Sequence, residues 1–199
     1  MKSNKQRAAY ILEKMDEPDA AYILAAMSPS DAGKILVEMG KKSASHILTQ
    51  MVTSNEQHEF YILENMHSQE AADILKEMTQ YNAANILKEI GSYYAACILA
   101  AMNQYDAAYI LESMAINNED GKAVNILAKM YPSTAAKILA KMDKDQADKI
   151  LAAMAEDDTR IAANILKEIG SYYATYILAA MPPYHAKTAA TGKIIKELK

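Results

Sequence analysis

The stretch Ala20–Met27 reads AAYILAAM, and variants of it recur along the whole chain of 199 residues. The pair Ile-Leu returns fourteen times, at intervals of twelve residues except for two intervals of fifteen and one of sixteen. The first residues of these pairs are Ile11, Ile23, Ile35, Ile47, Ile62, Ile74, Ile86, Ile98, Ile110, Ile126, Ile138, Ile150, Ile165 and Ile177. Self-similarity at a fixed period indicates a repeat protein, in which each unit buries its apolar face against other units.

The apolar positions of each unit lie on one side of an α-helix. Two alanines, the Ile-Leu pair and a methionine stand at i, i+1, i+3, i+4 and i+7, which at about 100° per residue form a single stripe. Residues that can cap a helix precede the stripe at Asp16, Ser28, Asn103 and Asp143. Glycines that predict a left-handed helix end follow it at Gly40, Gly91 and Gly170. Each unit is therefore predicted to be one short helix and a tight turn, and the methionines are predicted to fill the core.

The predicted fold is all-α: a right-handed α-solenoid, or superhelix, of about fourteen twelve-residue single-helix repeats, similar to an armadillo array. We expect a single domain over residues 1–199, with repeats over 8–181 and a C-terminal cap over 182–199. Short insertions at 52–59, 115–122 and 155–161 interrupt the period by three or four residues, about one helical turn. Each insertion either lengthens a helix or forms a loop.

Composition and charge narrow the classes of function. The net charge of −4 argues against a general affinity for nucleic acid or an anionic membrane. Cys97 is the single cysteine, and no apolar run is long enough to span a bilayer, so a cytoplasmic protein is expected. The four histidines have no ligand-like spacing, and the isolated glycines form no phosphate-binding loop. We therefore expect no enzyme, no cofactor and no assigned metal ligand.

Tyrosines occupy two positions opposite the apolar stripe, one directly before Ile-Leu and one four residues earlier. The residues predicted to form a binding surface are Tyr10, Tyr22, Tyr81, Tyr93, Tyr105, Tyr109, Tyr172 and Tyr176. Tyrosine is enriched in recognition surfaces, so one interpretation is an aromatic ladder that binds a protein or peptide. The alternative is that short helices bury this second face against more distant helices, and the rings fill that contact.

Charged residues allow two further interpretations. A basic stretch runs along the later units at Lys122, Lys129, Lys137, Lys141, Lys144 and Lys149. A solvated helix face explains it most simply, while an acidic partner or RNA is the alternative. The acidic pairs 119–120 and 157–158 lie in insertions, where they are either solvated or hold a divalent cation weakly.

The units over 19–29 and 106–114 resemble the intracellular N-terminal domain of the MgtE magnesium transporters. Related short-helix superhelices occur in flagellar motor proteins such as the switch protein FliG and the chaperone MotE. In MgtE this domain precedes a CBS pair and a transmembrane pore, and acidic residues at the domain interface help to bind regulatory magnesium. The resemblance extends over roughly residues 8–181 and rests on an apolar motif, so it implies the fold and assigns no ligand residue.

Two functions follow from these observations. The first is a non-enzymatic scaffold or adaptor that binds a protein or peptide on its helical-repeat surface. The alternative, implied by the resemblance, is a magnesium-responsive cytosolic regulatory module of an MgtE-like transporter.

Overall fold

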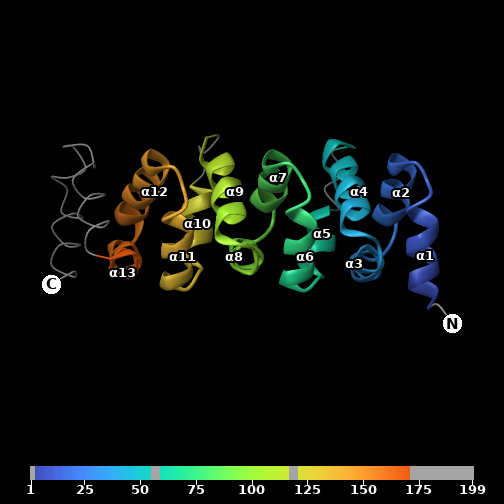
Figure 1. The fold of residues 1–199 in the computed structure, drawn as a ribbon, viewed down its shortest axis with the longest axis horizontal. Helices are drawn as coiled ribbons and strands as arrows, with labels where there is room; N and C mark the ends of the chain where they lie inside the picture. Colours follow the sequence, from blue (N-terminus) through green and yellow to red (C-terminus); the bar gives the residue numbers. More distant parts are fainter. Residues whose placement is uncertain (1–2, 55–58, 117–120, 171–199) are drawn as a thin grey trace. The chain divides into compact units, whose positions relative to one another are not determined.

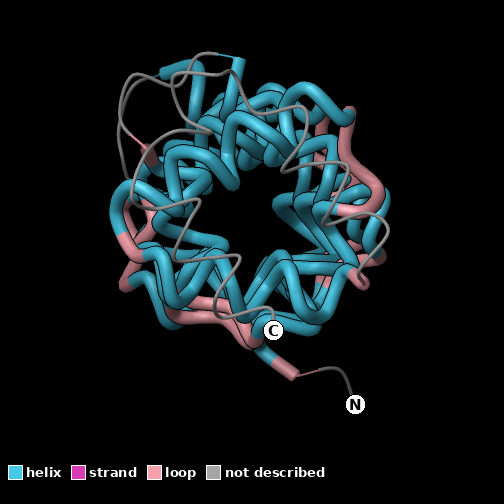
Figure 2. The backbone as a smooth tube through the Cα atoms, turned by 90° about the vertical axis from the view of Figure 1, so that its left-hand side faces the viewer, coloured by secondary structure: helices cyan, strands magenta, loops and turns pink. Residues whose placement is uncertain are grey.

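The computed structural model describes residues 3–54, 59–116 and 121–170, and this part of the chain consists of α-helices joined by short turns, without strands (Figures 1 and 2). The chain forms two compact units, residues 1–102 and 103–199. The prediction of an all-α helical-repeat fold is confirmed. That residues 1–199 form one domain with a continuous superhelix stays a prediction, and the expected cap over 182–199 lies outside the described residues.

Eight helices belong to the first unit and five to the described part of the second. Those of the first unit are α1 (Asn4–Leu12), α2 (Glu17–Ala25), α3 (Pro29–Glu38), α4 (Lys41–Ser54), α5 (Glu59–Glu64), α6 (Ser68–Leu75), α7 (Gln80–Glu89) and α8 (Ser92–Ala101). Those of the second are α9 (Gln104–Ile116), α10 (Lys122–Ala128), α11 (Pro132–Leu139), α12 (Lys144–Asp157) and α13 (Thr159–Ile169). Each described Ile-Leu pair falls in its own helix, as the period predicts.

Polar side chains fix where several of the helices begin. Ser28 accepts a hydrogen bond from the backbone N–H of Asp31, and Asp143 accepts from the N–H groups of residues 145 and 146. Asn103 caps α9 in the same way. Asp16 makes no such bond with its side chain, so the prediction of a side-chain cap was wrong there. The proline at the start of α2 lacks the N–H that would need a cap, and its fixed φ suits the first helical turn.

The Ile-Leu pairs form the core of each unit. Every described leucine of a pair is at most 5% exposed, and the described isoleucines of the pairs from Ile35 onward are at most 4% exposed. Ile11 and Ile23 differ, with exposures of 59% and 38%. They lie in α1 and α2, for which the structure contains no helix two positions earlier. Within the first unit, the isoleucine side of a helix is therefore the side covered by the helix two positions earlier.

Most helices pack mainly on the second helix along the chain, although α12 packs chiefly on the next one, α13. In the first unit α1 packs on α3, α2 on α4, α3 on α5, α4 on α6, α5 on α7 and α6 on α8. In the second unit α9 packs on α11, α10 on α12 and α11 on α13. Contacts also join α4 to α7 and α9 to α12. Each unit thus buries its apolar face against other units, as predicted, mainly against those two positions away in the sequence.

The insertions lengthen helices. The helices that precede or contain them, α4, α9 and α12, have 14, 13 and 14 residues, whereas the other helices have 6 to 11. An extra three or four residues can be added as about one turn of helix without changing the face that the stripe presents. This observation decides between the two alternatives for the described part of each insertion.

Two of the three glycines predicted to end helices in the left-handed region do not do so. Among the described glycines, only Gly121 and Gly170 have positive φ angles, 63° and 95°. Gly91 has φ −53° and is the N-cap of α8, and Gly40 lies directly before α4. Their prediction was wrong because the chain passes into the next helix through an extended residue, as N-cap geometry requires.

Candidate functional site

The tyrosine side chains at the two predicted positions are exposed wherever the structure describes them. Tyr10, Tyr22, Tyr81, Tyr93, Tyr105 and Tyr109 have exposures between 50% and 70%. Tyr172 and Tyr176 lie outside the described residues. The rings therefore do not fill contacts between helices, which was the alternative interpretation of this pattern.

Helix α9 brings two of these tyrosines together. Tyr105 and Tyr109 stand at i and i+4, the spacing that places two side chains on the same face of a helix. The ammonium group of Lys141, which follows α11, lies 4.8 Å from the centroid of the Tyr105 ring. This is the geometry of a cation–π contact, worth about 0.5–1 kcal/mol at an exposed position. The other four described tyrosines of the predicted set lie on four different helices, α1, α2, α7 and α8.

Neighbouring tyrosines on α8 have opposite roles. Tyr93 is 69% exposed, whereas Tyr94 is partly buried and its hydroxyl donates a hydrogen bond to the carbonyl oxygen of Met66. Burial is the main reason why the pKa of Tyr94 is raised above its usual value. Tyr94 thus joins α8 to the turn before α6. The predicted set of outward-facing tyrosines contains Tyr93 and leaves out Tyr94, in agreement with their exposures.

Three glutamates form a recurring link that sequence reasoning missed. A glutamate directly follows the Ile-Leu pair at Glu13, Glu64 and Glu112. Each accepts a hydrogen bond from a backbone N–H at the start of the third helix further along: Gly40 N at 2.6 Å from Glu13 Oε1, Gly91 N at 3.0 Å from Glu64 Oε1, and Asp143 N from Glu112 Oε1. A carboxylate there meets an N–H at the positive end of a helix, where it is stabilising. These bonds lie within the two units.

The charged pairs join side chains within one helix or between helices two positions apart. Asp73 bonds to Lys41, Lys76 and Gln69, and the hydrogen bond from Lys41 is the main reason why the pKa of Asp73 is lowered. His46 Nδ1 lies 3.1 Å from a carboxylate oxygen of Glu17. Among the described residues, no group of three or more His, Cys, Asp or Glu side chains could hold a metal ion. Of the histidines, His58 and His185 lie outside those residues.

Asp148 departs from the repeat. It occupies, on α12, the place of the second alanine of most units, and its Oδ1 is buried with no hydrogen-bond partner among the described residues. Burial is the main reason why the pKa of this carboxyl is raised. The sequence carried the signal for this site, since an acid replaces a small apolar residue on the buried stripe.

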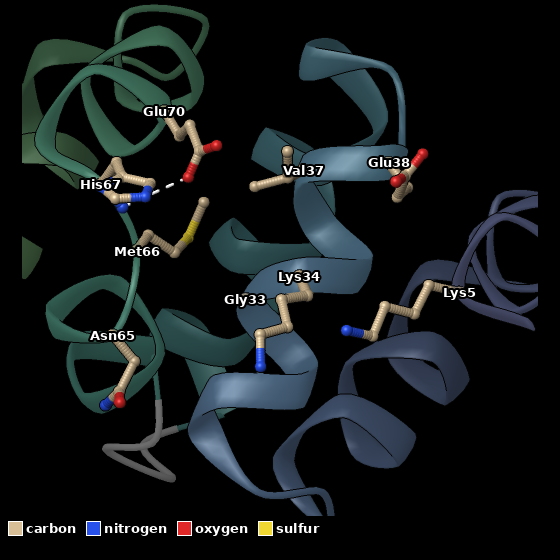
Figure 3. Close-up of a pocket in the computed structure, with 9 residues that line it drawn as sticks. All are labelled: Lys5, Gly33, Lys34, Val37, Glu38, Asn65, Met66, His67 and Glu70. Carbon is tan, nitrogen blue, oxygen red and sulfur yellow. Dashed lines mark hydrogen bonds between the residues drawn. The ribbon is translucent and has the colours of Figure 1, made fainter. Parts of the chain in front are cut away.

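A pocket of about 300 Å³ lies among α1, α3 and the turn between α5 and α6 (Figure 3). It is lined by Lys5, Gly33, Lys34, Val37, Glu38, Asn65, Met66, His67 and Glu70. The carboxylate of Glu70 accepts a hydrogen bond from the backbone N–H of His67 and so caps the N-terminal end of α6. Two ammonium groups in the lining oppose the binding of a divalent cation, and two carboxylates oppose an anion. The mixed charge therefore selects no class of ligand.

Gly33 lets the pocket wall pack closely. A Cβ atom at this position would lie 2.9 Å from Cγ of Met66, which is closer than a normal contact. Met66 itself is 6% exposed. The absence of a side chain at this position of α3 therefore allows α5 and the turn after it to approach α3.

Comparison with known families gives one finding. The family model of the MgtE intracellular N domain matches the chain twice, over residues 52–121 and 116–191, and the two matches together span 52–191. Two overlapping matches are typical of tandem repeats, because the family pattern fits in more than one register. No curated protein and no solved structure gives a match. None of the described helices is long and apolar enough to cross a membrane.

Proposed function

Because the chain belongs to the MgtE intracellular N-domain family, we propose that it is a non-enzymatic regulatory module that responds to Mg²⁺ and acts on a transporter of the MgtE type. The observation that carries the proposal is the family match over residues 52–191. The proposal transfers a role from the family to this chain and assigns no individual ligand. It places the chain in the cytosol, beside the membrane protein that it regulates.

The chemistry of Mg²⁺ suggests where the response arises. Mg²⁺ usually keeps several of its waters and is held by one or two carboxylates. The described residues contain no cluster of three acidic or imidazole ligands, but they contain exposed carboxylates in each unit. The proposed ion is therefore bound weakly by the chain alone. It is bound more tightly where a second protein surface contributes further oxygen ligands, which couples Mg²⁺ to association.

The test is co-sedimentation of the purified chain with vesicles that contain the MgtE-type transporter of its own host. We expect more chain to sediment with these vesicles at one of two Mg²⁺ concentrations, micromolar or millimolar, with NaCl added to match the ionic strength. Vesicles without the transporter are the control. Equal sedimentation with both kinds of vesicle at both concentrations would refute a regulatory role on such a transporter.

The second candidate is a protein-binding scaffold that needs no magnesium. The specific observation in its favour is the exposure of tyrosine rings at a recurring position of the helices. Large exposed aromatic side chains are enriched at the centres of protein interfaces. A scaffold of this kind would hold its partner equally well with and without Mg²⁺, which separates it from the first proposal.

A further inference from the structure

The second unit carries a surface on which aromatic and basic side chains meet. We define this basic aromatic face as Tyr105 and Tyr109 of α9, Lys137 of α11 and Lys141 after α11. All four side chains are exposed, the tyrosines to 56% and 50%. Helices α9 and α11 pack against each other, and the contact of Lys141 with the Tyr105 ring joins their side chains directly. The four residues therefore form one patch.

The lysines of this face form no ion pair with a carboxylate that the structure describes. Residues 121–142 contain four lysines and no aspartate or glutamate. Neither Lys137 nor Lys141 forms an ion pair with any residue that the structure describes. The two carboxylates of α9 are engaged elsewhere, since Asp106 bonds to the Asn103 amide and Glu112 bonds to the N–H of residue 143. Lys137 and Lys141 therefore present two positive charges that no described carboxylate pairs with, on a chain whose net charge is −4.

We propose that the basic aromatic face binds an acidic segment of a partner polypeptide. The ammonium groups of Lys137 and Lys141 pair with carboxylates of that segment, and the hydroxyl groups of the two tyrosines donate hydrogen bonds to them. The rings meanwhile pack against the apolar stems of glutamate side chains. Tyrosine supplies large contact area at low cost in side-chain entropy, which suits a small docking patch. This binding involves no metal and is independent of the magnesium response.

A polypeptide fits this face better than a nucleic acid. A single strand of nucleic acid follows a long positively charged groove, and its affinity depends on many phosphate contacts. The face offers two free lysines, and α12, which packs on both α9 and α10, carries Asp145 and Asp148 and ends at the acidic residues 156–158. These carboxylates repel an extended polyanion. A short acidic segment can bind to the patch without crossing α12.

Fluorescence polarisation of labelled peptides tests the proposal. The probes are a peptide of glutamate and serine residues, a peptide of lysine and serine residues of the same length, and an oligothymidylate. We expect the full chain to bind the glutamate peptide, with an affinity that falls as salt rises. The double variant Lys137→Gln with Lys141→Gln should bind it at least about tenfold more weakly, and so should Tyr105→Ser with Tyr109→Ser.

Two further variants make the result specific. Lys34→Gln with Lys42→Gln removes the same charge from exposed positions of the first unit, and its affinity should change less than about twofold. Lys137→Glu with Lys141→Glu should lose the glutamate peptide and gain the lysine peptide. Equal binding of the glutamate peptide by all variants, or no binding of it by the chain, would overturn the proposal. Tighter binding of the oligothymidylate would also overturn it in favour of nucleic acid.

Discussion

The side chain of Glu64 at the end of α5 accepts a hydrogen bond from the backbone N–H of Gly91, which lies 27 residues further along the chain. The bond caps the N-terminal end of α8, and Glu13 and Glu112 accept equivalent hydrogen bonds. A glutamate directly after Ile-Leu occurs at these three positions of the sequence, and each makes the bond. We therefore expect the bond to fix the spacing of helices that are three apart.

Glu64→Ala should lower the free energy of unfolding by about 1 kcal/mol, the usual net value of a hydrogen bond. Glu64→Gln keeps an acceptor and should lose less. Urea unfolding at constant m-value measures both changes. Glu77→Ala, at an exposed acid on the turn after α6, is the control and should change stability by less than about 0.5 kcal/mol. Equal effects of Glu64→Ala and Glu77→Ala would show that the link contributes nothing.

The paired tyrosines of α8 allow a matched comparison. Tyr94→Phe removes the hydroxyl that donates to the Met66 carbonyl and should destabilise the fold by about 0.5–1.5 kcal/mol. Tyr93→Phe removes the same atom from an exposed ring and should change stability by less than about 0.5 kcal/mol. Thermal melting of the two variants checks this difference. A larger effect at position 93 would contradict the assignment of the two side chains.

Leu99 tests the core of the first unit. Leu99 and Ile98 are both fully buried, so Leu99→Ala should cost about 2–5 kcal/mol. Ala100→Ser, at the exposed next position, is the control. The free energies of unfolding of both variants are measured in urea. A loss at Leu99 below about 0.5 kcal/mol would mean that the stripe does not face the core.

Asp148 predicts a dependence on pH. Its folded-state pKa lies above the ordinary value, so the folded protein binds this proton more tightly than the unfolded chain. The ionised carboxylate therefore costs stability above the raised pKa, and this cost disappears as the pH falls below the unfolded value. Asp148→Ala should stabilise the fold by about 1 kcal/mol at neutral pH, and the gain should shrink as the pH is lowered through the raised pKa.

The control for this prediction is Asp145→Ala, which removes an exposed acid from the first turn of the same helix. It should give no gain at neutral pH, because an acid in the first turn is stabilised by the helix dipole. Unfolding free energies of the three proteins across the acid range provide the measurement. A gain from Asp148→Ala that stays constant down to acid pH would exclude ionisation as its cause.

The helical repeat could be predicted from the sequence because the Ile-Leu pairs mark both the helix period and the buried face. The exposure of Tyr105 and Tyr109 followed from the same geometry, since these positions lie opposite the stripe. The packing of helices on the second helix along the chain could not be predicted. An apolar stripe can be buried against the next helix or against a more distant one, and it does not specify which. The outward position of Tyr93 was predicted, but the hydrogen bond from Tyr94 to Met66 depends on that packing and was not.

The glutamate links had a signal in the sequence that was not used. Glu13 precedes Gly40, and Glu64 precedes Gly91, by the same 27 residues. When an acid at the end of one helix and a glycine at the start of a later helix recur at the same spacing, the recurrence indicates a contact between those two units. Gly40 and Gly91 were instead interpreted only as the ends of the helices that precede them. The left-handed backbone predicted on that basis was wrong.

The melting midpoint of the full chain in MgCl₂, compared with NaCl at the same ionic strength, tests the proposed magnesium response most directly. An ion that binds only the folded state at about ten times its Kd stabilises that state by about 1.4 kcal/mol, which raises the midpoint by about 3–6 °C. We predict such a rise in millimolar MgCl₂. An unchanged midpoint throughout the millimolar range of MgCl₂ would contradict the account.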